Sequence, residues 1–182
     1  MNTATKALMG LVVALSLAGC TVVNAAPAPA TSSSAETENP YGGFAVANPA
    51  ADEVILTVTN GDKTIDFSTM DLKKLETTEV TIDEPFVNKK QTFVGVPMSV
   101  LFDSVGIKST DKVSTLALND YKYDDLAGKF TESKGIIAFL RDGTEIPMDQ
   151  GGPIRIVFPS ATPYFDYLDA WNWSIRSISI AE

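Results

Sequence analysis

Alternating apolar and polar residues predict a β-hairpin at the start of the folded part of the chain. In residues 54–58 every second position is apolar, which places these side chains on one face of an extended strand. Asn60-Gly61 follows, and this dipeptide is the strongest short-range signal for a tight hairpin turn. The alternation resumes at 65–67 beyond the turn. The pattern therefore predicts two antiparallel strands that share one buried face.

Helical spacing replaces this alternation in two short stretches. Ser68 or Thr69 is a suitable N-cap for a helix that extends to Leu75. Pro97 suits the first turn of a second helix, whose apolar residues recur at helical spacing until Gly106. Both helices are short, so we expect them to pack against a sheet.

The remaining apolar segments predict a mixed domain that is mostly β. Further strands are predicted at 80–82, 92–96, 113–118, 136–140 and 154–158. Residues 136–140 are apolar on both faces, which favours a central strand covered on both sides. Residues 124–128 are expected to be helical or irregular. The last strand requires a bulge near Arg176-Ser177, because Ile175 has the opposite parity to the isoleucines that follow. The predicted fold class is α+β.

The first 20 residues have the pattern of a bacterial lipoprotein signal peptide. The apolar run 7–19 is shorter than the roughly 20 residues of a membrane span and suits a secretory leader. It ends in Leu17-Ala18-Gly19-Cys20, a lipobox in which Cys20, the single cysteine of the chain, is the lipid attachment site. The alternative is an ordinary signal peptide cleaved after Ala25.

Composition then separates a tether from a folded domain. Residues 21–51 are rich in Ala, Pro, Ser, Thr and Asn, which predicts a disordered tether. Residues 52–182 suffice for one domain with its own core. Thr21, directly after the cysteine, resembles an outer-membrane sorting signal. The expected location is therefore the periplasm, with lipid anchoring to a bacterial membrane, the outer one.

Charge and composition exclude several function classes. Loss of the leader removes Lys6 and changes the formal net charge from −9 to −10, which argues against nucleic acid as a partner. The chain has no histidine, which excludes His-based triads and the usual zinc, copper and haem sites. With Cys20 assigned to lipid there is no disulfide. An all-oxygen calcium or magnesium site stays open, although no EF-hand spacing is present.

Several motifs in order resemble the molybdopterin-binding domain of the sulfite oxidase family. They are Phe93-Val94-Gly95-Val96-Pro97 with Leu101 and Gly106, Asn119-Asp120-Tyr121, Asp142-Gly143, Gly151-Gly152-Pro153 with the strand to Pro159, and Trp173. The match spans roughly residues 75 to 180. The resemblance implies an α+β fold with a pterin pocket formed by loops at one end of the sheet.

Two departures from the family pattern bear on activity. Catalytic members bind molybdenum through a cysteine thiolate on a strand before the Gly-Val-Pro helix, whereas residues 80–91 contain no cysteine. Members also place a basic residue before the tryptophan that Trp173 resembles, to meet the cofactor's phosphate. Asn172 stands at that position, and Asp169 is close to it in sequence. We therefore expect no enzyme activity and no molybdenum, with a pterin as the ligand.

A pterin is a flat ring with an amino group beside a ring N–H, so carboxylates and aromatic rings can bind it. The candidate ligand-binding residues are two tryptophans, three aspartates and a tyrosine at the place of a family active-site tyrosine: Trp171, Trp173, Asp120, Asp149, Asp169 and Tyr121. Trp173 has a core residue as its alternative, and Asp120 and Asp149 have turn residues. Arg155 is either a solvated strand residue or the buried ion-pair partner of one of these aspartates.

Three alternative functions are consistent with these sequence features. The resemblance extends to small secreted pterin-binding proteins that relay ligand status to membrane-bound cyclic-di-GMP enzymes, and it implies a non-catalytic periplasmic sensor or carrier with a membrane-anchored sensor domain as partner. The second is a structural or interaction lipoprotein with a vestigial pocket, whose contact is the aromatic loop 164–169. The third is a molybdenum-cofactor oxidoreductase with an unusual metal ligand.

Overall fold

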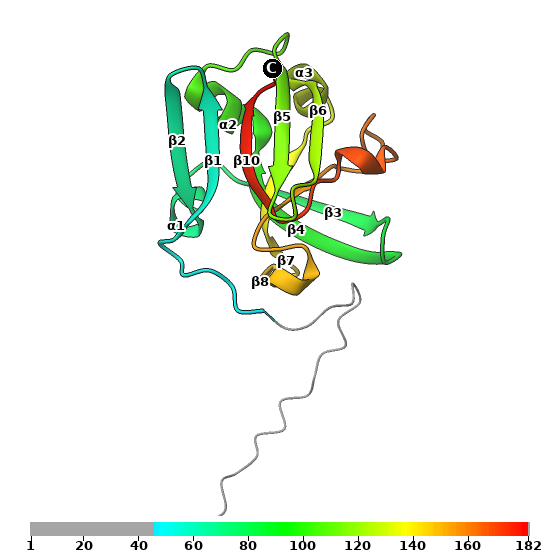
Figure 1. Ribbon diagram of the computed structural model, residues 1–182. Coiled ribbons are helices and arrows are strands. Elements are labelled where there is room, and N and C mark those ends of the chain that lie inside the picture. The colour runs from blue at the N-terminus through cyan, green and yellow to red at the C-terminus, as the bar shows by residue number, and fades with distance from the viewer. Residues whose placement is uncertain (1–45, 182) are drawn as a thin grey trace, which may run out of the picture. The chain divides into compact units, whose positions relative to one another are not determined.

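Two β-sheets form the frame of the domain in the computed structural model, which describes residues 46–181 (Figure 1). In the first sheet the strand order is β2 (Lys63–Ser68), β1 (Val54–Asn60), β10 (Ile175–Ile180), β5 (Lys112–Ala117) and β6 (Lys122–Leu126). In the second it is β3 (Thr78–Glu84), β4 (Lys89–Pro97), β7 (Ile136–Arg141) and β8 (Thr144–Glu145), with β9 (Arg155–Val157) also paired to β7. The predicted α+β class, mostly β, is confirmed.

Short helices connect and cover these sheets. They are α1 (Thr69–Leu72), α2 (Met98–Val105), α3 (Ala127–Glu132) and the 3₁₀ turns η1 (Met148–Gln150) and η2 (Leu168–Ala170). Ser68 caps α1 as predicted, because its hydroxyl accepts a hydrogen bond from the Asp71 amide in a capping box. α2 begins after Pro97 and ends at Gly106, whose φ of 79° is left-handed. α2 contacts β1 and β2 of the first sheet and β4 of the second.

The C-terminal strand lies in the middle of the first sheet. β10 pairs parallel with β1 and antiparallel with β5. Its register shifts between Ile175 and Ser177, so the predicted bulge is confirmed. This placement brings residues 171–174, directly before β10, next to the turn that joins β5 to β6. The parallel pairing with the first hairpin has no local signal in the sequence.

The prediction for residues 124–128 is wrong in its first half. Residues 122–126 form the edge strand β6, and helix α3 begins only at Ala127. The strand is fixed by pairing along β5, from Leu116 opposite Lys122 to Lys112 opposite Leu126. Long-range pairing therefore overrides a weak local pattern.

The second sheet supplies the doubly covered strand that the sequence predicts. Residues 136–139 of β7 are all buried, and β7 lies between β4 on one side and β8 and β9 on the other. Within residues 46–181 no helix is long and apolar enough to cross a membrane. The predicted signal peptide, the lipid site at Cys20 and the tether up to residue 45 lie outside the described residues.

Candidate functional site

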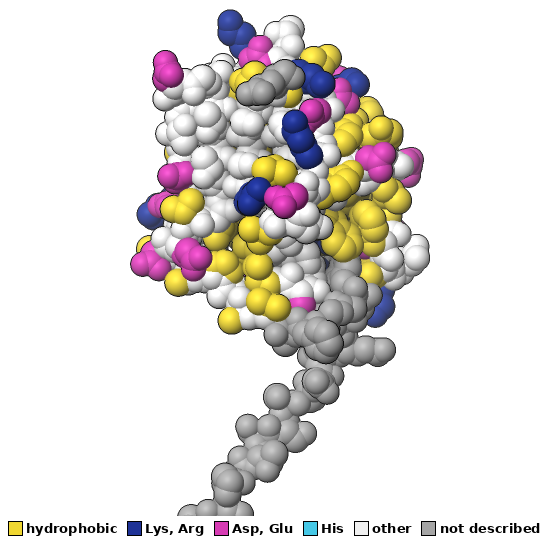
Figure 2. Space-filling model, in the orientation of Figure 1, with side chains coloured by type: hydrophobic (Ala, Val, Ile, Leu, Met, Phe, Trp, Pro, Cys, Tyr) yellow, Lys and Arg dark blue, Asp and Glu magenta, His cyan; other side chains and the backbone are white. Residues whose placement is uncertain are grey.

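Three loops meet around a cavity of about 310 Å³ at one end of the sheets. The β3–β4 turn contributes Phe86, and the β5–β6 turn contributes Asn119 and Tyr121. The segment from η2 to β10 contributes the rest of the lining: Leu168, Trp171, Asn172 and Trp173. In Figure 2, hydrophobic side chains gather on the right-hand side, over the segment that contains η2. The cavity is therefore an aromatic one, and we call it the aromatic cavity.

Burial distinguishes the floor of the aromatic cavity from its rim. Trp171 is 4% exposed and Asn172 is fully buried, so both lie at the floor. Phe86 and Tyr121 are 40% and 42% exposed, so their rings form the rim. A flat ligand that enters the cavity meets these two rings first. Phe86 was not predicted as a site residue, because no sequence signal places a turn residue beside distant tryptophans.

A buried ion pair fixes the turn that carries Phe86. The Glu84 carboxylate accepts from the Arg155 guanidinium at 2.9 Å, and both side chains are fully buried. The other Glu84 oxygen accepts from the backbone amides of Phe86 and Val87, at 2.8 and 2.9 Å. Arg155 was expected as a solvated residue or as a partner of an aspartate. The structure shows it buried and paired with a glutamate instead.

The same guanidinium lies beneath the aromatic rings. Arg155 Cζ is 4.1 Å from the centroid of the Trp173 ring and 5.6 to 6.0 Å from those of Phe93, Phe86 and Trp171. A cation at this distance from an indole face is attracted by the ring quadrupole. The ion pair of Glu84 and Arg155 therefore supports both the β3–β4 turn and the Trp173 ring.

Trp173 also packs closely against Gly151 and Phe86. A Cβ at Gly151, whose φ is +84°, would lie 3.2 Å from atoms of the Trp173 ring, so any other residue would crowd the ring and strain the backbone. The Phe86 ring meets Trp173 edge-on, with centroids 4.6 Å apart. Trp171 is held by its Nε1–H, which donates to the Tyr164 carbonyl at 3.0 Å. Both predicted tryptophans line the cavity, mainly as its supports.

Tyr121 is held at the rim by the predicted residue Asp169. The Tyr121 hydroxyl donates to the backbone carbonyl of Asp169 at 2.9 Å. Burial raises the pKa of Tyr121, and the negative charge of Asp169 raises it further. The phenol therefore stays protonated and can donate a hydrogen bond across the physiological pH range.

The other two predicted aspartates lie outside the aromatic cavity. Asp120 is in a left-handed turn conformation with a φ of 64°, and its carboxylate pairs with Arg176 at 2.8 Å. Asp149 lines an adjoining cavity of about 340 Å³, which shares Asn119 and Trp173 with the first. The structure thus brings Trp171, Trp173 and Tyr121 together and leaves these two carboxylates beside them. Their roles toward a ligand stay predictions.

A hydrogen-bonded cluster attaches the loop before η2 to the first sheet. Asp125 Oδ2 accepts from the hydroxyls of Tyr164 and Tyr123, and Lys129 pairs with the same carboxylate at 2.8 Å. Burial alone would raise the pKa of Asp125, but hydrogen bonds from Lys129, Tyr164 and the Leu126 amide outweigh it and lower the pKa to about 2. Asp125 therefore remains ionised and holds the segment that ends in Trp171.

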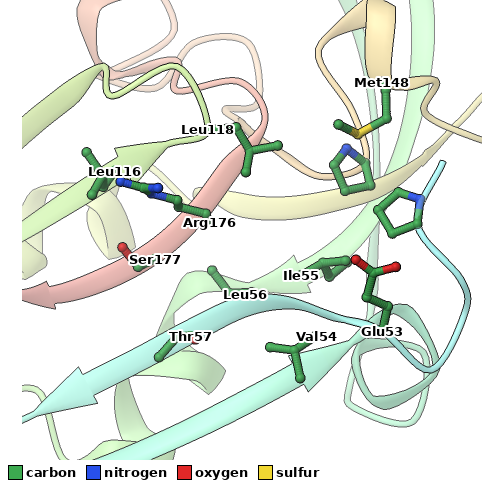
Figure 3. A pocket seen from close by; sticks show the side chains of 12 residues that line it. Glu53, Val54, Ile55, Leu56, Thr57, Leu116, Leu118, Met148, Arg176 and Ser177 are labelled. Carbon is green, nitrogen blue, oxygen red and sulfur yellow. The ribbon is translucent and has the colours of Figure 1, made fainter. Parts of the chain in front are cut away.

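A larger groove of about 630 Å³ lies on the first sheet (Figure 3). Its wall is aliphatic, with Val54 and Leu118 about half exposed. Figure 3 shows Glu53 beside Ile55 at one end and Arg176 beside Leu116 at the other. We call it the aliphatic groove. None of the six predicted ligand-binding residues lines it.

The aromatic cavity fits the pterin part of a molybdenum cofactor better than the metal part. Two exposed rings and a buried amide suit a flat heterocycle with N–H donors. Among residues 46–181 there is no group of three His, Cys, Asp or Glu side chains that could hold a metal ion. Residues 80–91, from β3 into β4, contain no cysteine, and the carboxylate of Glu84 at the end of β3 already binds Arg155. The described residues therefore provide no group of side chains for the metal.

Comparison with known protein families shows which family the chain belongs to. The family model described as an oxidoreductase molybdopterin binding domain matches residues 44–165, more than half of the chain. The chain belongs to this family. The matched range includes Phe86, Asn119 and Tyr121, and it ends before the tryptophans. A search of the curated proteins finds no match.

The fold is also found in a solved structure. The domain resembles the sulfane dehydrogenase SoxCD from Paracoccus pantotrophus, with a TM-score of 0.56 and 19% sequence identity. The similarity covers 74% of this chain but only 39% of that one. At this identity the likeness shows the sulfite-oxidase-like fold, as the resemblance implied.

Family membership corrects two predictions. We expected that the chain is not an enzyme and that it binds no molybdenum, and both are contradicted by a family model that describes oxidoreductases with molybdopterin. Both predictions rested on two observations. Residues 80–91 contain no cysteine, and position 172 has an asparagine in place of a basic residue. The family is defined by the whole domain, so the loss of two contacts did not justify excluding its chemistry.

Proposed function

We propose that this chain is a cofactor domain of a molybdopterin-dependent oxidoreductase and that it binds the pterin in the aromatic cavity. The observation that carries the proposal is the pair of exposed rings, Phe86 and Tyr121, above a floor that contains the buried amide of Asn172. Family membership supports the same ligand class. The aromatic cavity is preferred to the larger aliphatic groove because it offers fixed polar groups beside the rings.

Each residue has a defined part in binding. Phe86 and Tyr121 stack on the faces or edges of the ring system, and the aromatic floor excludes water from its inner edge. The Tyr121 hydroxyl donates its hydrogen bond to the backbone carbonyl of Asp169, which fixes the ring at the rim. When bound, the cofactor supplies the electron-transfer chemistry of the family. The chain orients it and shields it from solvent.

The site of action that we propose is the bacterial periplasm. The leader 1–20, the lipid site at Cys20 and the tether 21–51 support anchoring to a membrane, the outer one. The partner that we propose is a membrane-anchored periplasmic sensor domain linked to a cyclic-di-GMP enzyme. Two exposed side chains of the segment that leads to the cavity, Tyr167 and Leu168, support a protein contact beside it.

Purification from the native host tests the cofactor proposal. Full-length protein extracted in detergent is expected to contain a pterin, detected by its fluorescence after oxidative release, together with molybdenum by metal analysis. The Phe86→Ala variant is expected to retain clearly less pterin per folded protein. Folded protein that contains neither pterin nor molybdenum, from cells that make the cofactor, would contradict the proposal.

A further inference from the structure

Shared side chains connect the aromatic cavity to the aliphatic groove through the adjoining cavity of about 340 Å³. The adjoining cavity has Asn119 and Trp173 in common with the aromatic cavity. It also has Leu118 and Met148 in common with the groove, and Figure 3 shows these two side chains along one edge of the groove. The aromatic cavity and the groove themselves share no lining residue among those described. The adjoining cavity therefore lies between the other two hollows.

The lining of the adjoining cavity combines polar and apolar side chains. Asp149 and Ser174 line it together with Trp173, and their carboxylate and hydroxyl oxygens are hydrogen-bond acceptors. Leu118 and Met148 belong to its apolar part, which continues into the aliphatic wall of the groove. A molecule that spans the two hollows is therefore amphipathic, with a polar end in the adjoining cavity and an apolar body in the groove.

The charges around these hollows do not suit an anion. Among the described lining residues, neither the aromatic cavity nor the adjoining cavity has a lysine or an arginine. The groove has one cation, Arg176, and that side chain pairs with Asp120 at 2.8 Å. Two carboxylates, Glu53 and Asp149, line the groove and the adjoining cavity. An anionic molecule would therefore meet like charges without a cation to offset them.

We propose that the adjoining cavity and the aliphatic groove form the substrate site, and that the substrate is an organic molecule with an aliphatic body and a polar end without negative charge. This inference rests on the proposed function, because a cofactor in the aromatic cavity makes the hollow beside it the place of reaction. The polar end lies beside Trp173, and the body lies against Val54 and Leu118. Apolar burial favours any aliphatic body, so the polar end determines how the molecule is placed.

Ligand-observed NMR titration of the full-length protein in detergent tests the substrate class, with a titration of the detergent alone subtracted. The probes are hexylamine, butylamine and hexanoate, at physiological ionic strength so that distant charges are screened. Hexylamine is expected to bind roughly tenfold more tightly than butylamine, because two more methylenes leave water. Hexanoate has the same body with an anionic end and is expected to bind about tenfold more weakly than hexylamine. Equal binding of hexylamine and hexanoate, or no gain with chain length, overturns the inference.

A matched pair of variants tests the location of the site. Val54→Asn puts a polar side chain on the wall of the groove and is expected to weaken hexylamine binding roughly fivefold. Met70→Asn is the control, because Met70 is 48% exposed against 54% for Val54 and lines none of the three hollows. This control is expected to leave hexylamine binding unchanged. Equal effects of the two variants overturn the assignment to the groove.

Pterin binding by the same preparations separates this inference from the proposed function. Saturating 6-hydroxymethylpterin is expected to leave hexylamine binding in place, because the two probes occupy different hollows. Competition between them would put both in one hollow and overturn the inference. Protein that binds the pterin but not hexylamine also overturns it, and leaves the aromatic cavity as the pterin site. Protein that binds hexylamine but no pterin counts against the proposed function, and the substrate site falls with it.

Discussion

The aromatic cavity and the aliphatic groove are built differently, and size alone would select the wrong one. The groove, at about 630 Å³, has twice the volume of the cavity, at about 310 Å³. Its charged groups are exposed, and its Arg176 pairs only with a carboxylate whose side chain is 80% exposed. The cavity stands on a charge pair that is fully buried. Volume measures space, whereas recognition depends on groups held in fixed positions.

The aliphatic groove and the aromatic cavity differ in how well they can discriminate between ligands. Aliphatic side chains such as Val54 and Leu118 favour any apolar surface, because hydrophobic burial has no direction. Rings and amides in the cavity are fixed by Glu84, Arg155 and the Asp125 cluster, so they can discriminate between ligands. A preorganised site requires buried polar supports, and only the cavity has them among these two hollows.

The largest expected effect comes from breaking the buried pair beneath the cavity. Arg155→Met leaves the Glu84 carboxylate buried without its cation, and we expect a loss of about 3–5 kcal/mol in the free energy of unfolding. Chemical denaturation monitored by circular dichroism measures it. The double variant Glu84→Met/Arg155→Met is expected to recover part of the loss, because no unpaired charge remains. Equal stability of Arg155→Met and the native protein would show that the pair does not support the cavity.

Acid titration tests the cluster that holds the loop before Trp171. The pKa of Asp125 is lowered from 3.8 to about 2, so its contribution is complete above about pH 5 and is lost as the pH falls toward 2. The shift corresponds to roughly 2 kcal/mol. Asp125→Asn is expected to lose about this amount at neutral pH and to show a shallower fall in stability below pH 4. Asp120→Asn, in the exposed pair, serves as control, and a comparable loss there would refute the contrast.

Pterin binding separates the two hollows directly. Phe86→Ala removes an exposed rim ring, and stacking of a flat heterocycle on such a ring is worth about 1–3 kcal/mol, or roughly fivefold to hundredfold in affinity. Leu118→Ala, an equally exposed side chain of the aliphatic groove, is expected to leave pterin affinity unchanged. Titration of both variants with 6-hydroxymethylpterin checks this. The reverse pattern would place the ligand in the groove.

The smallest effect is expected at the exposed ion pair of the groove. Arg176→Gln removes the contact with Asp120, and the free energy of unfolding should change by no more than about 1 kcal/mol. Because salt screens exposed charges, even this difference should vanish at high ionic strength. Denaturation at low and high salt measures it. A loss as large as that of Arg155→Met would mean that exposure does not separate the two regions.

Local patterns determined much of the fold. Asn60-Gly61 makes the first hairpin, Ser68 caps α1, and Pro97 and Gly106 bound α2, as expected from turn and capping chemistry. The bulge before Ser177 followed from the parity of isoleucines alone. These features depend on residues within a few positions of each other, so the sequence is sufficient to predict them.

The complete candidate site could be identified only from the tertiary structure. Trp171, Trp173 and Tyr121 were predicted, since two aromatics and a motif tyrosine are visible in the chain. The rim ring Phe86 was not, because Glu84 and Arg155, 71 positions apart, place it beside Trp173. The orientation of the buried Asn172 amide likewise depends on Thr115, 57 positions away on β5. Periodicity reports which face a residue occupies, but only the packed sheets decide which distant partners it meets.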